Sequence, residues 1–152
     1  MLVQESTRIF GEMPLVSKVH KMSWDQFDEF ADFLHGMMTN DPWIPSCVVG
    51  LARGGLPLAV TLSHKFNIPM HPVTFQTRDG SQQDTFVCPK DALVVDDIND
   101  SGKTLQMFMK NQDASVRTAV LINKPESEYD VEYTAWVSPY DHDVWFQFPW
   151  EG

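Results

Sequence analysis

A run of acidic and small residues follows an apolar segment near the middle of the chain. Val94-Val95 leads into Asp96-Asp97-Ile98-Asn99-Asp100-Ser101-Gly102-Lys103-Thr104, which places three carboxylates within five residues and then a Ser-Gly-Lys-Thr turn. Carboxylates at a buried strand end are costly unless they meet a metal ion or sugar hydroxyls. The turn, if it opens a helix, offers backbone N–H groups to a phosphate. The stretch therefore predicts a site for a nucleotide-type ligand, and the alternative is an acidic loop that caps the next helix.

Better-known phosphate and metal motifs are excluded. A P-loop needs a glycine five positions before Gly102, where Asp97 stands, and no G-x-G-x-x-G occurs to support a dinucleotide site. The histidines show no ligand spacing, so we expect no metal cluster built from them. They stand at positions 20, 35, 64, 71 and 142.

The elements that must position these residues alternate in type. Ser23 to Gln26 reads as a capping box, and apolar residues at helical spacing predict a helix over about 24–38. We further expect strands over 47–51, 70–75, 92–96 and 115–122, helices over 57–66 and 103–110, and a mobile polar loop over 76–84. This alternation predicts an α/β domain with one parallel sheet and helices on both of its faces.

A second candidate junction follows the first predicted sheet strand. In open α/β sheets ligands bind at the carboxyl ends of the strands, and Ala52-Arg53-Gly54-Gly55 lies at such an end. Paired glycines let backbone amides approach an anion closely, and Arg53 adds a charged fork. The alternative is that Gly-Gly makes only a tight turn before the helix.

The end of the chain differs in composition. After Lys124 there is no Lys or Arg, seven carboxylates appear, and six of the 18 aromatic residues fall within 136–152. So much aromatic surface predicts that this tail folds back over something flat. The alternative is that the aromatic residues seal a sheet edge or a subunit contact.

Length and charge limit the remaining possibilities. With 152 residues, 43% of them apolar, the chain supports one domain, which we place at 18–152 after an N-terminal arm of unknown role at 1–17. The formal charge of −10 disfavours nucleic-acid binding. The start does not resemble a signal peptide, and no apolar run is long enough to span a bilayer, which predicts a cytoplasmic protein without membrane insertion. We expect Cys47 and Cys88 to be buried free thiols.

The acidic stretch also carries a family resemblance. Val94 to Thr104 resembles the signature with which type I phosphoribosyltransferases bind 5-phosphoribosyl 1-pyrophosphate (PRPP). Ala52 to Gly55 is similar to the first loop of the bacterial xanthine-guanine phosphoribosyltransferase group. Asn123-Lys124-Pro125 is similar to the Lys-Pro of that group, and Val144 to Glu151 to its C-terminal Trp-x-x-x-Pro-Trp-acid segment. The resemblance covers about residues 18–152 and implies the parallel-sheet fold of the family with a small aromatic hood at the C-terminus.

The resemblance implies a role for each matching position. The PRPP ribose hydroxyls and Mg²⁺ would be held by Asp96 and Asp97, and proton transfer with the base would fall to Asp100. The 5′-phosphate would be bound by Asp100, Ser101, Gly102, Lys103 and Thr104, and pyrophosphate by Arg53 and Gly54, with a cis peptide between Ala52 and Arg53. The base would be bound by Lys124 at its 6-oxo group, by stacking on Trp145, and by backbone carbonyls near Phe146 and Glu151.

The implied activity is transfer of a 5-phosphoribosyl group from PRPP to a 6-oxopurine (guanine, xanthine or hypoxanthine), giving a nucleoside monophosphate and pyrophosphate. Mg²⁺ would be the cofactor, and the chain would form a homo-oligomer. One departure is that the basic residue of the family's mobile loop is missing at Gln82-Gln83-Asp84, where Arg78 is the only cation nearby. The alternative is therefore a non-catalytic phosphoribosyltransferase-like module that binds a nucleotide as a regulator or as part of an assembly.

Overall fold

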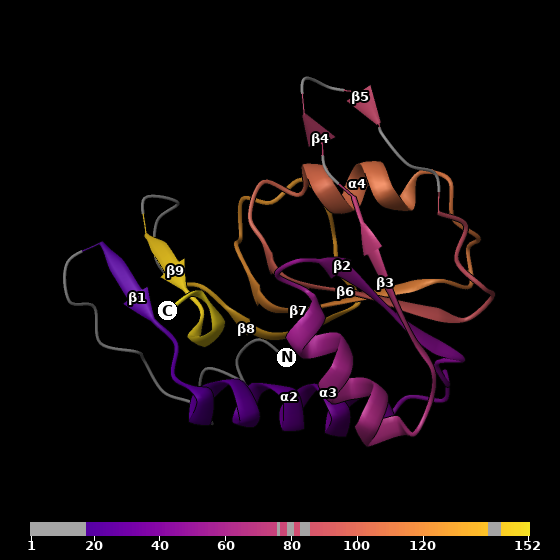
Figure 1. Cartoon of the computed structure of the whole chain (residues 1–152), viewed down its shortest axis with the longest axis horizontal. Helices are drawn as coiled ribbons and strands as arrows, with labels where there is room; N and C mark the ends of the chain where they lie inside the picture. Colours follow the sequence, from indigo (N-terminus) through magenta and orange to yellow (C-terminus); the bar gives the residue numbers. More distant parts are fainter. Residues whose placement is uncertain (1–17, 76, 79–80, 83–85, 140–143) are drawn as a thin grey trace.

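The computed structural model of the chain describes residues 18–75, 77–78, 81–82, 86–139 and 144–152 (Figure 1). The predicted N-terminal arm at 1–17 lies outside these residues, as do His142 and the Gln83-Asp84 part of the loop whose missing cation was noted.

The centre of the molecule is a five-stranded parallel sheet in the order β3-β2-β6-β7-β8. Its strands are β2 (Cys47–Ala52), β3 (Met70–Thr74), β6 (Ala92–Asn99), β7 (Arg117–Asn123) and β8 (Tyr133–Val137). The central strands contain continuous apolar runs because both faces of the sheet are covered, and the first four residues of β6 are fully buried. The predicted α/β class with a parallel sheet is confirmed.

Helices cover both faces of this sheet, as predicted. Helices α2 (Trp24–Thr39) and α3 (Leu56–Phe66) lie on one face, and α4 (Lys103–Met109) lies on the other (Figure 1). The predicted capping box opens α2, where the Ser23 hydroxyl accepts from the Gln26 backbone N–H and the Gln26 side chain accepts from the Ser23 N–H. Each face has its own cluster of buried apolar side chains.

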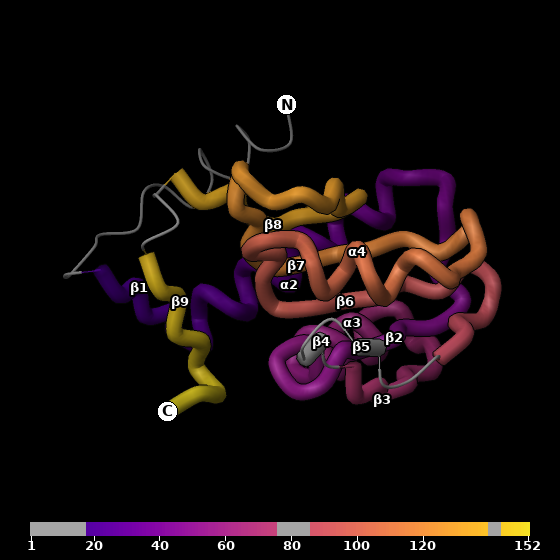
Figure 2. The backbone as a smooth tube through the Cα atoms, turned by 90° about the horizontal axis from the view of Figure 1, so that it is seen from above, coloured from indigo at the N-terminus to yellow at the C-terminus, as the bar shows by residue number. Residues whose placement is uncertain are grey.

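The chain ends in a small second layer of structure. Strand β1 (Val19–Lys21) pairs in parallel with β9 (Trp145–Gln147), and a 3₁₀ turn, η1 (Pro149–Glu151), follows. Figure 2 shows β1 and β9 side by side at one end of the molecule, away from β2 and β3. The Trp150 ring stacks on Phe148 and meets Phe27 of α2 edge-on. The tail is therefore fastened to the body of the protein by aromatic contacts and by β1.

Three features differ from the predicted elements. Strand β6 runs on to Asn99, beyond the predicted end at 96, because β7 continues to pair with it there. Strand β8 was not predicted, since it lies in a polar, carboxylate-rich part of the sequence. The predicted loop at 76–84 contains two short antiparallel strands, β4 (Thr77–Arg78) and β5 (Ser81–Gln82).

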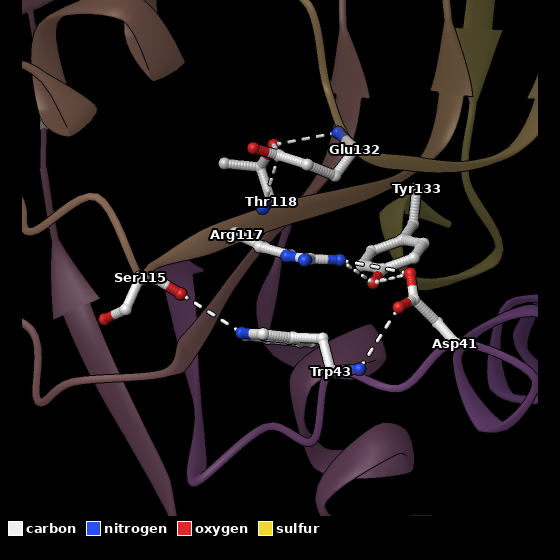
Figure 3. A network of polar contacts seen from close by, with 7 residues as sticks. All are labelled: Asp41, Trp43, Ser115, Arg117, Thr118, Glu132 and Tyr133. Atoms are coloured by element: carbon white, nitrogen blue, oxygen red, sulfur yellow. Dashed lines mark hydrogen bonds and ion pairs between the residues drawn. The ribbon is translucent and has the colours of Figure 1, made fainter.

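A polar network braces the amino ends of β7 and β8 (Figure 3). The Arg117 guanidinium donates to the Asp41 carboxylate at 3.0 Å and to the Tyr133 hydroxyl at 2.7 Å. It also lies over the ring of Trp43, 5.0 Å from its centroid, and Trp43 in turn donates from Nε1 to the Ser115 carbonyl. The network ties the loop after α2 to the sheet at the end opposite the acidic stretch.

None of the helices in the described part of the chain combines the length and the apolar character that a membrane span needs.

Candidate active site

The predicted junctions converge at the carboxyl ends of β2, β6 and β7. A cavity of about 650 Å³ is lined by Arg53, Gly54, Asp97, Trp150 and Glu151. A second of about 200 Å³ reaches Lys124 and the aromatic tail, and a third of about 210 Å³ lies over the turn before α4. Asp97 lines all three cavities. One carboxylate therefore stands where three adjoining spaces meet.

The Gly-Gly loop is shaped by close packing. The peptide between Ala52 and Arg53 is cis, which confirms that prediction. A Cβ on Gly55 would lie 2.5 Å from the Val95 carbonyl oxygen, so this glycine is needed for the turn itself. A Cβ on Gly54 would instead run into the carboxylate of Asp97, 2.7 Å from its Cγ. Gly55 thus fits the tight-turn interpretation, whereas Gly54 keeps the first cavity open beside Asp97.

The two adjacent carboxylates on β6 are partly withdrawn from water. The Asp97 backbone N–H donates to Asp96 Oδ1 at 2.9 Å, and the Ile98 N–H donates to Asp97 Oδ1 at 2.8 Å. Removal from solvent raises the pKa of Asp96 well above its usual value, and the neighbouring charge of Asp97 raises it further. The pKa of Asp97 is also raised, chiefly by removal from solvent, with the nearby charge of Glu151 adding to the effect. The pair therefore favours a cation or hydroxyl donors beside it.

The turn after β6 lines the third cavity. Ser101, Gly102 and Thr104 are all in its wall. Gly102 has a φ of 88°, and a Cβ there would lie 2.6 Å from the backbone nitrogen of Tyr129, so only glycine fits. The start of α4 is bonded by a serine rather than by a carboxylate: Ser101 Oγ accepts from the Lys103 backbone N–H at 3.3 Å, and the N-cap residue Gly102 makes no side-chain cap. The alternative of an acidic loop that serves only to cap this helix is therefore not supported.

Asp100 and Lys124 are brought into contact. The Lys124 Nζ lies 3.1 Å from Asp100 Oδ1 and donates to the Val144 carbonyl at 3.3 Å. The Lys124 side chain is 4% exposed, whereas that of Asp100 is 59% exposed. Lys124 is thus not a solvated residue at a strand end. Its ammonium group is buried beside the second cavity, with its charge balanced by a carboxylate that faces solvent.

The aromatic tail forms one wall of the second cavity. Phe146 is buried against Trp136, and its ring lies 5.9 Å from the Lys124 Nζ. Trp145, by contrast, is 65% exposed while still lining the cavity. The Glu151 carboxylate accepts from the Phe148 backbone N–H at 2.9 Å, which fixes the last turn. Most of the tail seals the body of the protein, and Trp145 is left free on the rim.

Two functional-site neighbours were missed from the sequence. Asn99 and Asn123 end β6 and β7 directly before Asp100 and Lys124, and their side chains are hydrogen-bonded at 2.8 Å. The available signal was an Asn directly before a charged residue at the end of each of two apolar-rich segments. The prediction about the missing loop cation stays a prediction, because Gln83 and Asp84 lie outside the described residues.

Metal binding by protein groups alone is not supported in the described part of the chain. No three His, Cys, Asp or Glu side chains there come together as an ion site. Cys47 and Cys88 are both buried and free, as predicted. Burial raises the pKa of Cys88 to about 12.

Comparisons with known proteins identify relatives of the whole domain. The chain is 26% identical over 147 residues to a xanthine-guanine phosphoribosyltransferase of Cereibacter sphaeroides, covering 86% of this chain and 85% of that protein. A purine phosphoribosyltransferase structure from Pyrococcus horikoshii matches with a TM-score of 0.72 and 27% identity, over 89% of this chain and 95% of that one. The Helicobacter pylori xanthine-guanine-hypoxanthine phosphoribosyltransferase shares the fold, with a TM-score of 0.73 and 21% identity over 88% and 93% of the two chains. The model of the phosphoribosyl transferase domain matches residues 23–151, and the chain therefore belongs to the phosphoribosyl transferase family.

Proposed function

We propose that this protein transfers the 5-phosphoribosyl group of PRPP to a 6-oxopurine (guanine, xanthine or hypoxanthine), releasing pyrophosphate and a nucleoside monophosphate. The observation that carries the proposal is the buried Lys124 ammonium group, 3.1 Å from Asp100 and beside a cavity walled by Trp145. A purine in that cavity would meet a hydrogen-bond donor, a carboxylate and an aromatic face together. The names of the Cereibacter sphaeroides and Pyrococcus horikoshii relatives agree with a purine as acceptor.

The phosphoribosyl donor is assigned to the other two cavities. Ser101 to Thr104, with Asp100, would bind the 5′-phosphate over the turn before α4, and Asp96 and Asp97 would meet the ribose hydroxyls. Arg53 and Gly54 would bind the pyrophosphate group in the 650 Å³ cavity. Asp97 would then stand between ribose and pyrophosphate, and its place in all three cavities supports this assignment.

The residues present fit Mg²⁺ as the cofactor. In proteins this ion is commonly held by one or two carboxylates together with substrate phosphates, rather than by a full cage of side chains. Asp96 and Asp97 supply two adjacent carboxylates whose pKa values are raised chiefly by removal from solvent, so a cation beside them would favour their charged form. When bound there with PRPP, Mg²⁺ would neutralise charge on the leaving pyrophosphate.

The reaction depends on positioning of the two substrates rather than on a nucleophilic side chain of the protein. The bond from the ribose C1′ to pyrophosphate breaks, a purine nitrogen bonds to C1′, and the purine loses a proton. Lys124 would donate to the 6-oxo group, and Asp100 would accept the proton. Trp145 would stack on the base, and backbone carbonyls near Phe146 and Glu151 would contact its 2-position.

Release of pyrophosphate distinguishes this enzyme from the alternative, a nucleotide-binding regulatory module. The protein should release pyrophosphate from PRPP only when Mg²⁺ and a 6-oxopurine are both present, and a chelator should stop the reaction. Binding of PRPP and nucleotide without any release would support the regulatory module instead. The homo-oligomer and the cytoplasmic location also stay predictions, and sedimentation of the purified protein tests the first.

A further inference from the structure

We propose that Asn99 is a positioning residue that, together with Asn123, holds the base half and the phosphate half of the site in one register. This inference rests on the proposed function and concerns two residues outside the assigned binding set. Asn99 is 2% exposed although it is polar, and it is the residue directly before Asp100. Burying an amide side chain costs free energy unless its polar atoms are hydrogen-bonded, so the partners of the Asn99 amide show why an asparagine is tolerated here.

Both hydrogens of the Asn99 side-chain amide are used. One is donated to Asn123 Oδ1 and the other to the Tyr129 carbonyl oxygen, each at 2.8 Å. The Asn99 backbone carbonyl in turn accepts from the Lys124 N–H at 3.0 Å. Asn99 therefore holds both ends of the loop from Lys124 to Tyr129.

This loop also touches the phosphate-binding turn. The Glu128 N–H donates to the Ser101 carbonyl at 2.9 Å, and Gly102 packs so closely on the Tyr129 backbone nitrogen that no side chain fits between them. The loop thus begins at the lysine assigned to the base and ends against the turn assigned to the 5′-phosphate. Because Asn99 fixes both ends, it sets the distance between the two halves.

Asn123 completes the arrangement from the next strand. It pairs with Asn99 in the register of β6 and β7 and comes directly before Lys124. Its backbone carbonyl accepts from the Ser138 N–H at 3.0 Å, which ties it to the end of β8. The two asparagines therefore join the strand that carries Asp100 to the strand that carries Lys124.

Guanosine monophosphate and ribose 5-phosphate separate this role from a merely structural one, because only the first spans both halves of the site. Asn99→Leu keeps the side-chain shape but removes both donors. It should weaken binding of guanosine monophosphate, measured by titration calorimetry, about tenfold, and binding of ribose 5-phosphate less than about twofold. Asn123→Leu removes one of the two bonds and should weaken the nucleotide about threefold. It also serves as the test if Asn99→Leu does not fold.

Tyr133→Phe is the matched control. Tyr133 is buried at the amino end of β8, where its hydroxyl donates to Asp41 and accepts from Arg117, so the variant loses two hydrogen bonds at the end of the sheet opposite the site. It should lower the melting temperature without changing the affinity ratio of the two ligands, the kcat, or the KM for guanine. Asn99→Leu should raise that KM and lower the kcat.

Equal losses for both ligands, no loss in either asparagine variant, or the same change in Tyr133→Phe would overturn the positioning role while leaving the proposed function intact. A parent protein that neither binds guanosine monophosphate nor forms it from guanine and PRPP would overturn the proposed function, and this inference with it.

Discussion

Replacing Gly54 by alanine tests whether the Asp97 carboxylate must keep its observed position. The new Cβ would lie 2.7 Å from Asp97 Cγ and nearer still to Oδ2, whereas ordinary van der Waals contact begins at 3.4 Å. To restore ordinary contact, the Asp97 carboxylate would have to move away by about 0.7 Å at Cγ, and by more at Oδ2. This movement would strain or break the hydrogen bond that Asp97 Oδ1 accepts from the Ile98 N–H at 2.8 Å.

The expected effect is large for the addition of one methyl group. A misplacement of about 1 Å in a positioning group can cost roughly 10²-fold in rate. Gly54→Ala should therefore lower kcat/KM for PRPP about a hundredfold, measured as pyrophosphate release at saturating guanine. The melting temperature should change little, because the methyl group meets a side chain that borders the 650 Å³ cavity and not the packed core.

A second glycine supplies the control. Gly36 lies in helix α2, and a Cβ there would meet nothing within 4 Å. Gly36→Ala should leave turnover unchanged and stabilise the protein by roughly 0.5–1 kcal/mol, since alanine has the higher helix propensity. If Gly54→Ala keeps its kcat/KM within about threefold of the parent, the place assigned to Asp97 between ribose and pyrophosphate is wrong.

Three further outcomes are expected. Asp100→Asn should keep ribose 5-phosphate binding but lose about 10²- to 10⁴-fold in turnover, because the amide cannot accept the purine proton; a loss below threefold would make Asp100 structural. Lys124→Ala should abolish the preference for 6-oxopurines over adenine in competitive turnover, and an unchanged preference would remove the base-reading role of this lysine. Cys88 should resist iodoacetamide in the native protein and react after denaturation, since its raised pKa of about 12 leaves little thiolate at neutral pH; fast native labelling seen by mass spectrometry would contradict its burial.

The helix and strands that position the site could be predicted from the sequence, because each of them has a strong local pattern. The capping box at Ser23 begins α2 where expected, and the apolar runs that give β2, β6 and β7 could be read directly. Since parallel strands bring their carboxyl ends to one edge, Arg53, Asp97 and Lys124 could be expected to meet. In the structure, Asp97 lines one cavity with Arg53 and another with Lys124.

Other features depend on contacts between distant segments, which a local pattern does not report. Strand β8 is stabilised by pairing with β7 and by packing of α2 against Trp136, although its surroundings in the sequence are polar. The pairing of β1 with β9 joins the two ends of the described chain. The burial of Lys124 and the amide bond between Asn99 and Asn123 likewise arise only when neighbouring strands align.

The most direct test of the proposed function is competitive turnover of guanine, xanthine, hypoxanthine, adenine and orotate in one mixture with PRPP and Mg²⁺, with the nucleotides separated and counted. The proposed function predicts nucleoside monophosphates of the three 6-oxopurines only, formed in equal amount with pyrophosphate, and none in the presence of a chelator. Adenine turned over as fast as guanine, or no nucleotide from any base, would contradict it.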